Sequence, residues 1–211
     1  RESTMGGLVA NALRDGVSDF ADADLGVTNP GGLRAELLYA GDTADNPVNT
    51  DGVVTYAEAN AVLPFSNTIA VVTLTGAELV EVLEQQWQPE GSSRPFLKLG
   101  LSDNVTYTYD PDAAAGSRIT SVSIEGEPID SAGTYTVASG SFLIGGGDNF
   151  SVLAEGADRK DTGLIDTDAF VNYFSARDVV EPDFRKQAIA VSDAPSELTE
   201  GDEVSFTVSD V

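Results

Sequence analysis

Two short segments of the chain place polar and aromatic groups in turns, where a small ligand can reach them. Residues 28–34 combine two glycines, which allow close backbone approach, with the amide of Asn29 and the guanidinium of Arg34. A guanidinium can bind an anion through two parallel hydrogen bonds. Residues 62–68 place Phe65 directly after a proline, where an exposed ring can stack on a nucleobase. The alternatives are a plain turn with a surface arginine and a phenylalanine of the core.

A third segment, residues 142–150, begins with Phe142 and contains a glycine triplet followed by Asp148. The triplet, which ends in Gly146 and Gly147, favours a bend over a regular helix or strand. A carboxylate just beyond a glycine-rich turn can accept hydrogen bonds from both hydroxyls of a ribose. The spacing differs from the dinucleotide-binding fingerprint, because no capped helix follows it directly. By itself this segment is weak evidence for a nucleotide site.

Residues 49–58 partly imitate a calcium-binding loop. However, Pro47 stands where the first acidic ligand belongs, and Glu58 is explained as part of a helix cap. We therefore expect no cofactor in this chain itself.

The composition excludes several kinds of chemistry. The 211 residues include no Cys and no His, so thiolate, imidazole and catalytic-triad mechanisms are ruled out. A net charge of −24, from 35 acidic and 11 basic residues, argues against binding a nucleic acid polymer or an anionic membrane. The acidity fits a secreted or high-salt setting, or simply a well-solvated surface. The first residues do not form a signal peptide, and we interpret them as a position inside a longer protein.

Helices and strands must alternate to position these turns, which predicts an α+β (mixed α/β) class. Helical spacing and two capping boxes predict helices near residues 4–16, 55–63, 75–88 and 166–176, the last capped by Asp166 or Thr167. Alternation and β-branched residues predict strands near residues 23–28, 68–74, 104–109, 119–125 and 134–138. The last three strands are expected to pair as antiparallel hairpins.

The composition changes after Lys186. Residues 187–211 carry six acidic side chains and no basic one, and residues 204–208 alternate like a strand. Two interpretations stay open for this tail. It is either an acidic linker or the start of an immunoglobulin-like β module, which its turn and alternating strand resemble. The predicted division is therefore a domain over residues 1–186 and a separate tail over 187–211.

Over residues 1–176 the chain resembles the C-terminal, substrate-recognition domain of the 5′-nucleotidase and UDP-sugar hydrolase family. The resemblance rests on six motifs that occur in the family's order: Met5-Gly6-x-Leu8, Thr28-Asn29-x-Gly31-Gly32-x-Arg34, Val62-Leu63-Pro64-Phe65-x-Asn67-Thr68, Leu74-Thr75-Gly76-x-Glu78-Leu79, Phe142-Leu143-x-x-Gly146-Gly147-Asp148 and Asp161-Thr162-Gly163. Six ordered motifs are far more specific than any one of them.

The resemblance implies seven substrate-binding residues: Asn29, Arg34, Phe65, Phe142, Gly146, Gly147 and Asp148. It assigns Phe65 and Phe142 to a sandwich around the base and Asp148 to the ribose hydroxyls. It places Asn29 near the base and ribose, and Arg34 on the phosphate. The ligand implied is thus an AMP-like nucleotide or a nucleoside.

The resemblance also implies a catalytic domain upstream in the same chain. In the family, a metallophosphoesterase domain holds two divalent metal ions with His, Asp and Asn ligands, so this chain alone is expected to be inactive. Family members also carry another phosphate-binding arginine near the position of Arg1, which does not align clearly. Pro30 stands where the family often has glycine. Alternative functions are a non-catalytic binding or adhesion module, or recognition of a cyclic nucleotide or nucleotide sugar. An extracellular or cell-surface location is expected.

Overall fold

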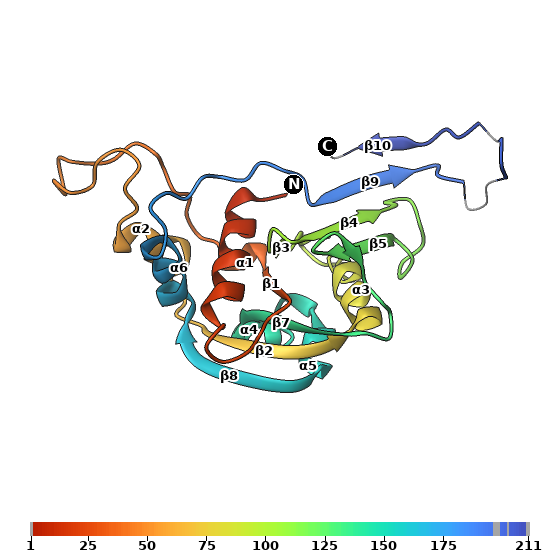
Figure 1. Cartoon of the computed structure of the whole chain (residues 1–211), viewed down its shortest axis with the longest axis horizontal. Helices are drawn as coiled ribbons and strands as arrows, with labels where there is room; N and C mark the ends of the chain where they lie inside the picture. The colour runs from red at the N-terminus through yellow and green to blue at the C-terminus, as the bar shows by residue number, and fades with distance from the viewer. Residues whose placement is uncertain (1, 196–198, 202, 210–211) are drawn as a thin grey trace.

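The computed structural model describes residues 2–195, 199–201 and 203–209, which form two five-stranded sheets with flanking helices (Figure 1). The first sheet has the order β3-β1-β7-β2-β8. In it β1 and β7 run parallel, while β2 runs antiparallel to both of its neighbours. Its strands are β1 (Leu25–Thr28), β2 (Thr68–Thr75), β3 (Gly100–Leu101), β7 (Thr134–Gly140) and β8 (Ala157–Ile165). This mixed sheet and its helices confirm the predicted fold class.

One core lies between the first sheet and three helices: α1 (Thr4–Gly16), α2 (Tyr56–Val62) and α6 (Asp166–Ser175). The hydroxyl of Ser3 caps α1 by accepting a hydrogen bond from the Gly6 amide. Buried apolar side chains from α1, α6 and β2, including Leu13, Phe170 and Ile69, meet in this core.

A second core fills the opposite face of the sheet, beneath α3 (Gly76–Glu84), α4 (Ser141–Ile144) and α5 (Ser151–Glu155). Strand β2 supplies both cores, because Ile69 and Val71 belong to the first while Ala70 and Val72 belong to the second. A strand covered on both faces reads as a continuous apolar run. The capping boxes predicted for α2 and α3 are both formed.

The second sheet has the order β10-β9-β4-β5-β6. Its strands are β4 (Val105–Tyr109), β5 (Ile119–Ile124), β6 (Glu127–Pro128), β9 (Ala188–Ser192) and β10 (Thr207–Ser209). The β4–β5 hairpin is antiparallel, as predicted. The prediction that β7 continues this hairpin is wrong, since β7 pairs with β1 and β2 in the first sheet. The buried middle of β7, residues 137–139, needs cover that a hairpin edge does not offer.

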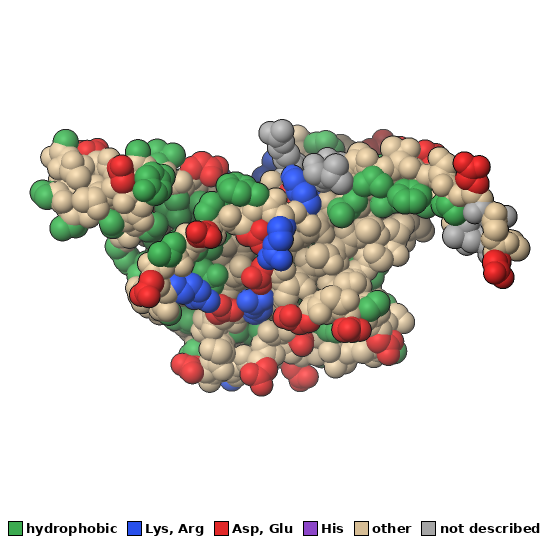
Figure 2. All heavy atoms as spheres, turned by 45° about the horizontal axis from the view of Figure 1, so that its top comes forward, with side chains coloured by type: hydrophobic (Ala, Val, Ile, Leu, Met, Phe, Trp, Pro, Cys, Tyr) green, Lys and Arg blue, Asp and Glu red, His purple; other side chains and the backbone are tan. Residues whose placement is uncertain are grey.

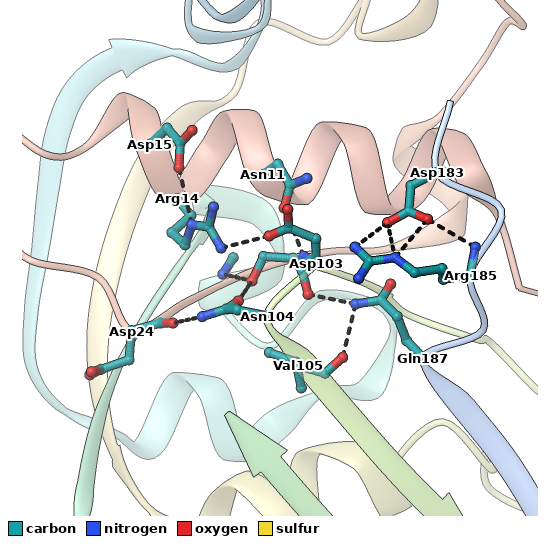
Figure 3. Close-up of polar contacts among 12 residues, drawn as sticks. Asn11, Arg14, Asp15, Asp24, Asp103, Asn104, Val105, Asp183, Arg185 and Gln187 are labelled. Carbon is teal, nitrogen blue, oxygen red and sulfur yellow. Dashed lines mark hydrogen bonds and ion pairs between the residues drawn. The ribbon is translucent and has the colours of Figure 1, made fainter. Parts of the chain in front are cut away.

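The tail begins against the main body of the chain. Strand β9 pairs in parallel with β4, and Ala188 and Ala190 are buried. Figure 3 shows the Gln187 side-chain amide, which donates to the carbonyl oxygens of Ser102 and Val105. The predicted boundary after residue 186 stays a prediction. The strand predicted at residues 204–208 begins only at Thr207, and positions 202 and 211 lie outside the described residues.

Four further elements differ from the prediction. Helix α3 ends at Glu84 rather than near residue 88, because Trp87 leaves it to form a bridge with Phe96. Asp166 lies inside the first turn of α6 and not at its cap. Strand β8 was not predicted, since its mostly exposed residues lack an apolar pattern. The predicted glycine-rich loop begins as a short helix, α4, which carries Phe142.

Candidate functional site

The strand directions bring the three sequence segments to one edge of the first sheet. Because β1 and β7 run parallel and β2 runs the other way, two carboxyl ends and one amino end meet there. The turn η1 (Pro30–Gly32) follows β1, Phe65 precedes β2, and α4 follows β7. Together with Arg94 they enclose an open pocket of about 460 Å³. The pocket is lined by Asn29, Gly31, Gly32, Arg34, Phe65, Asn67, Arg94, Phe142 and Asp148.

Two phenylalanine rings on this pocket are about half exposed. Phe65 is 57% exposed and Phe142 is 51% exposed, whereas Phe150, at the other end of the glycine segment, is fully buried. Phe65 lies beneath a cation, since the guanidinium carbon of Arg34 is 5.7 Å from its ring centroid. Exposed rings lose apolar contact, so a ligand that covers both of them would be favoured.

The Asp148 carboxylate is fixed at both of its oxygens. Asn29 Nδ2 donates to Oδ2 over 2.7 Å, and Arg94 Nη2 lies 3.4 Å from Oδ1. A Cβ atom at Gly31 would come within 3.2 Å of the same Oδ2, so this glycine leaves room for the carboxylate. The Asp148 backbone has a φ of 53°, a left-handed conformation that is uncommon outside glycine.

Arg34 is an exposed arginine on the pocket. Its Nη1 donates to the Gly31 carbonyl oxygen over 3.3 Å in an exposed position. No ion pair of Arg34 with a carboxylate is formed among the described residues. Its remaining donors are therefore available to an anion.

Of the seven predicted site residues, five line the pocket and two lie behind it. Gly147 supports the ring of Phe142, because a Cβ atom there would lie only 2.4 Å from that ring. Gly146 turns the chain with a φ of 86°. These two glycines do not line the pocket themselves, but they set the position of Phe142 and of the turn that carries Asp148.

The family profile described as 5′-nucleotidase, C-terminal domain, matches residues 1–155. The chain belongs to the 5′-nucleotidase C-terminal domain family.

Relatives of this 5′-nucleotidase C-terminal domain are much longer proteins. A cell wall protein of Listeria monocytogenes is 34% identical over 181 residues, which cover 82% of this chain and 21% of that protein. A trifunctional nucleotide phosphoesterase of Bacillus subtilis is 30% identical, over 81% of this chain and 11% of its own length. The crystal structure of a 5′-nucleotidase precursor from Thermus thermophilus matches with a TM-score of 0.74 and 31% identity, over 90% of this chain and 36% of that one.

The described part of this domain contains neither a cluster of metal ligands nor a membrane-spanning helix. Among the described residues no group of three or more His, Cys, Asp or Glu side chains is placed to hold a metal ion. Within the same residues, no helix has both the length and the apolar character to cross a membrane. Arg1, which does not align clearly with the additional phosphate-binding arginine that the resemblance implies, lies outside the described residues.

Sequence reasoning missed two polar residues of the pocket. Arg94 lies in an irregular segment after α3, where no periodic pattern marks it. Asn67 was part of a family motif without an assigned role, and its Nδ2 donates to Asp166 Oδ2 over 3.1 Å. The Asn67 carbonyl oxygen also accepts the Asp166 backbone amide. Asp166 thus positions a side chain of the pocket from behind.

We expect Asp166 to make the stability of this domain depend on pH. Burial raises the pKa of its carboxyl group above the ordinary value, against the opposing hydrogen bonds from Asn67 and Thr167. The folded state therefore holds this proton more tightly than the unfolded chain does. The contribution is fully present below the unfolded pKa of about 3.9 and is lost as pH rises through the raised, folded pKa.

The measurement is the free energy of unfolding from urea titrations between about pH 4 and 7, for the wild type and for Asp166→Asn. Subtracting the variant isolates this one group from the other carboxylates. The wild-type advantage should shrink with rising pH. An advantage that grows with pH would show that the charged form is favoured in the folded state.

Proposed function

We propose that this domain binds a nucleotide or nucleoside and presents its phosphate to a phosphoesterase domain elsewhere in the parent protein. The observation that carries the proposal is the pairing of two half-exposed rings, Phe65 and Phe142, with a fixed carboxylate on one pocket. The rings would stack on the base, and Asp148 would accept the ribose hydroxyls. Asn29 would hold that carboxylate and face the sugar, and Arg34 would bind the phosphate.

The charge distribution supports an anionic ligand at this place. The chain carries −24 overall, and on the face drawn in Figure 2 the Asp and Glu side chains are spread over many elements. The pocket, in contrast, is lined by two arginines and one acidic residue. A local excess of positive charge can bind one nucleotide, while the overall charge disfavours a polymer with many phosphates.

The activity of the parent protein is part of the same proposal. Relatives include a trifunctional nucleotide phosphoesterase and proteins named 5′-nucleotidase, and this domain spans about a tenth to a third of their length. We infer that the parent is a phosphoric ester hydrolase whose upstream domain supplies two divalent metal ions, and that this chain alone does not hydrolyse nucleotides. The cell wall relative supports an extracellular or surface location.

A surface binding module without catalysis is the second candidate, because one relative is named only as a cell wall protein. Phosphate release from AMP by the parent protein separates the two candidates. Hydrolysis supports the enzyme, and nucleotide binding without hydrolysis supports the module. A cyclic nucleotide or nucleotide sugar would use the same pocket, and competition against AMP would reveal that preference.

A titration of the 211-residue chain with adenosine and with AMP tests the pocket directly. At millimolar ligand, we expect amide NMR shifts at residues 29–34, 65–67 and 142–149, and none along β5 in the second sheet. AMP should shift the Arg34 region more than adenosine does, because only AMP carries a phosphate. The proposal fails if neither ligand shifts the residues around the two rings.

A further inference from the structure

The segment of residues 86–97, which we call the 86–97 hairpin, folds back on itself beside the pocket. Trp87 and Phe96 form an antiparallel bridge, the Leu97 amide donates to the Gln86 carbonyl oxygen, and the Gln88 amide donates to the Pro95 carbonyl oxygen. The hairpin is anchored in the second core, where the buried Gln86 side chain donates to the Leu83 carbonyl oxygen.

Both arms of the 86–97 hairpin contact the turn that carries the carboxylate. From one arm, Gln88 Oε1 accepts a hydrogen bond from Asn149 Nδ2 over 2.8 Å. From the other arm, Arg94 Nη2 lies 3.4 Å from Asp148 Oδ1. The turn is therefore held at two neighbouring residues by one element.

This turn needs such support because of its backbone. Asp148 has a φ of 53° and Asn149 a φ of 65°, so two successive residues other than glycine adopt the left-handed region. Such conformations persist where the surrounding structure fixes them, and they are common at ligand sites. Asn29 donates to Oδ2 of Asp148, which leaves Oδ1 to Arg94.

We propose that Arg94 is a positioning residue that sets how the pocket recognises the sugar, an inference that rests on the proposed function. A carboxylate held at one oxygen can rotate about its bond to Cβ, whereas one held at both oxygens keeps a single orientation. Each Asp148 oxygen retains acceptor capacity after these two contacts. With Arg94 in place, the carboxylate is already oriented before the two ribose hydroxyls bind to it. Binding therefore loses less conformational entropy.

Arg94 itself is well placed to act through Asp148. Its side chain is 55% exposed, whereas that of Asp148 is 16% exposed. Arg94 Nη1 lies 3.5 Å from the position that a Cβ of Gly31 would occupy, so the guanidinium also lies beside the glycine turn. Neither the family motifs nor the periodicity of the sequence marks this residue.

The experiment compares adenosine, 2′,3′-dideoxyadenosine and AMP by calorimetric titration of the wild type and Arg94→Gln. The variant should bind adenosine about 1.5- to 5-fold more weakly, the range of an exposed ion pair. It should bind the dideoxy nucleoside as the wild type does, because that ligand has no hydroxyls for Asp148. Gln88→Ala, which removes the other contact, should shift the preference in the same direction. Arg185→Gln is the matched control, since Arg185 is an exposed arginine paired with Asp183 away from the pocket.

Three outcomes would overturn the inference. Equal losses for both nucleosides in Arg94→Gln and Gln88→Ala would mean that the 86–97 hairpin supports the pocket as a whole. Loss of AMP binding with adenosine unaffected would make Arg94 a phosphate ligand. Unchanged binding of adenosine would leave Asp148 independent of it. If the wild type binds neither nucleoside, the proposed function itself is wrong, which is a distinct result.

Discussion

Replacing Phe142 with alanine is expected to weaken adenosine binding by roughly 5- to 150-fold, since stacking contributes about 1–3 kcal/mol per base. The ring is half exposed on the pocket and seated against Gly147, so its removal opens the wall without leaving a cavity in either core. Phe65→Ala should act in the same direction, while Phe142→Trp should retain most of the affinity. Calorimetric titration with adenosine gives the dissociation constants.

A phenylalanine outside the pocket supplies the control for this prediction. Phe184 is 76% exposed and does not line the pocket, so Phe184→Ala should bind adenosine as the wild type does. Thermal unfolding of each variant checks that the fold is retained. If Phe65→Ala and Phe142→Ala both bind like Phe184→Ala, the base does not lie between the two rings.

Gly26→Ala is expected to lower the free energy of unfolding by about 3 kcal/mol or more, because overpacking of a rigid contact is costly. Gly26 lies in β1 beneath α1, and a Cβ atom there would lie 1.9 Å from the Ala10 carbonyl oxygen and 2.8 Å from its carbon. Both neighbours are backbone atoms, so relief requires the whole helix to move away from the strand. Urea unfolding measures the loss.

Gly7→Ala is the matched control, and Gly7 lies on α1, the helix that packs against Gly26. A Cβ atom at Gly7 would make ordinary contacts at 3.5 Å with Gln187 and Leu101. Alanine is favoured over glycine inside a helix by about 1 kcal/mol, so this variant should be as stable as the wild type or more so. A Gly26→Ala variant with wild-type stability would contradict the close approach of α1 to β1.

Local signals in the sequence predicted local structure well. The Thr55–Glu58 and Thr75–Glu78 capping boxes form as predicted, because both partners lie within one helical turn. Pairing between distant strands was less accessible. The sequence of β7 fits a hairpin edge as well as a sheet centre, and only the cover from both cores decides between them.

The site shows the same division. Asn29, Arg34 and Phe142 were predicted from motifs that turn residues and glycines mark clearly, and the parallel pairing of β1 and β7 brings them together. Arg94 was missed because an arginine in an irregular segment looks like any surface charge until the fold places it beside Asp148. Its position depends on the 86–97 hairpin, which no short-range pattern encodes.

The two-sided packing of β2 has a practical consequence for producing this protein. The family match ends at residue 155, yet β8 and α6 follow that point: β8 pairs with β2 as the edge strand of the first sheet, and α6 packs on the first core. A recombinant version that ends at residue 155 would leave β2 as an unpaired edge strand. It would also lack Phe170 and so expose the apolar side chains of the first core that pack against this ring. Such surfaces promote aggregation during expression. Soluble material is therefore expected only from versions that extend at least through Ser175, the end of α6.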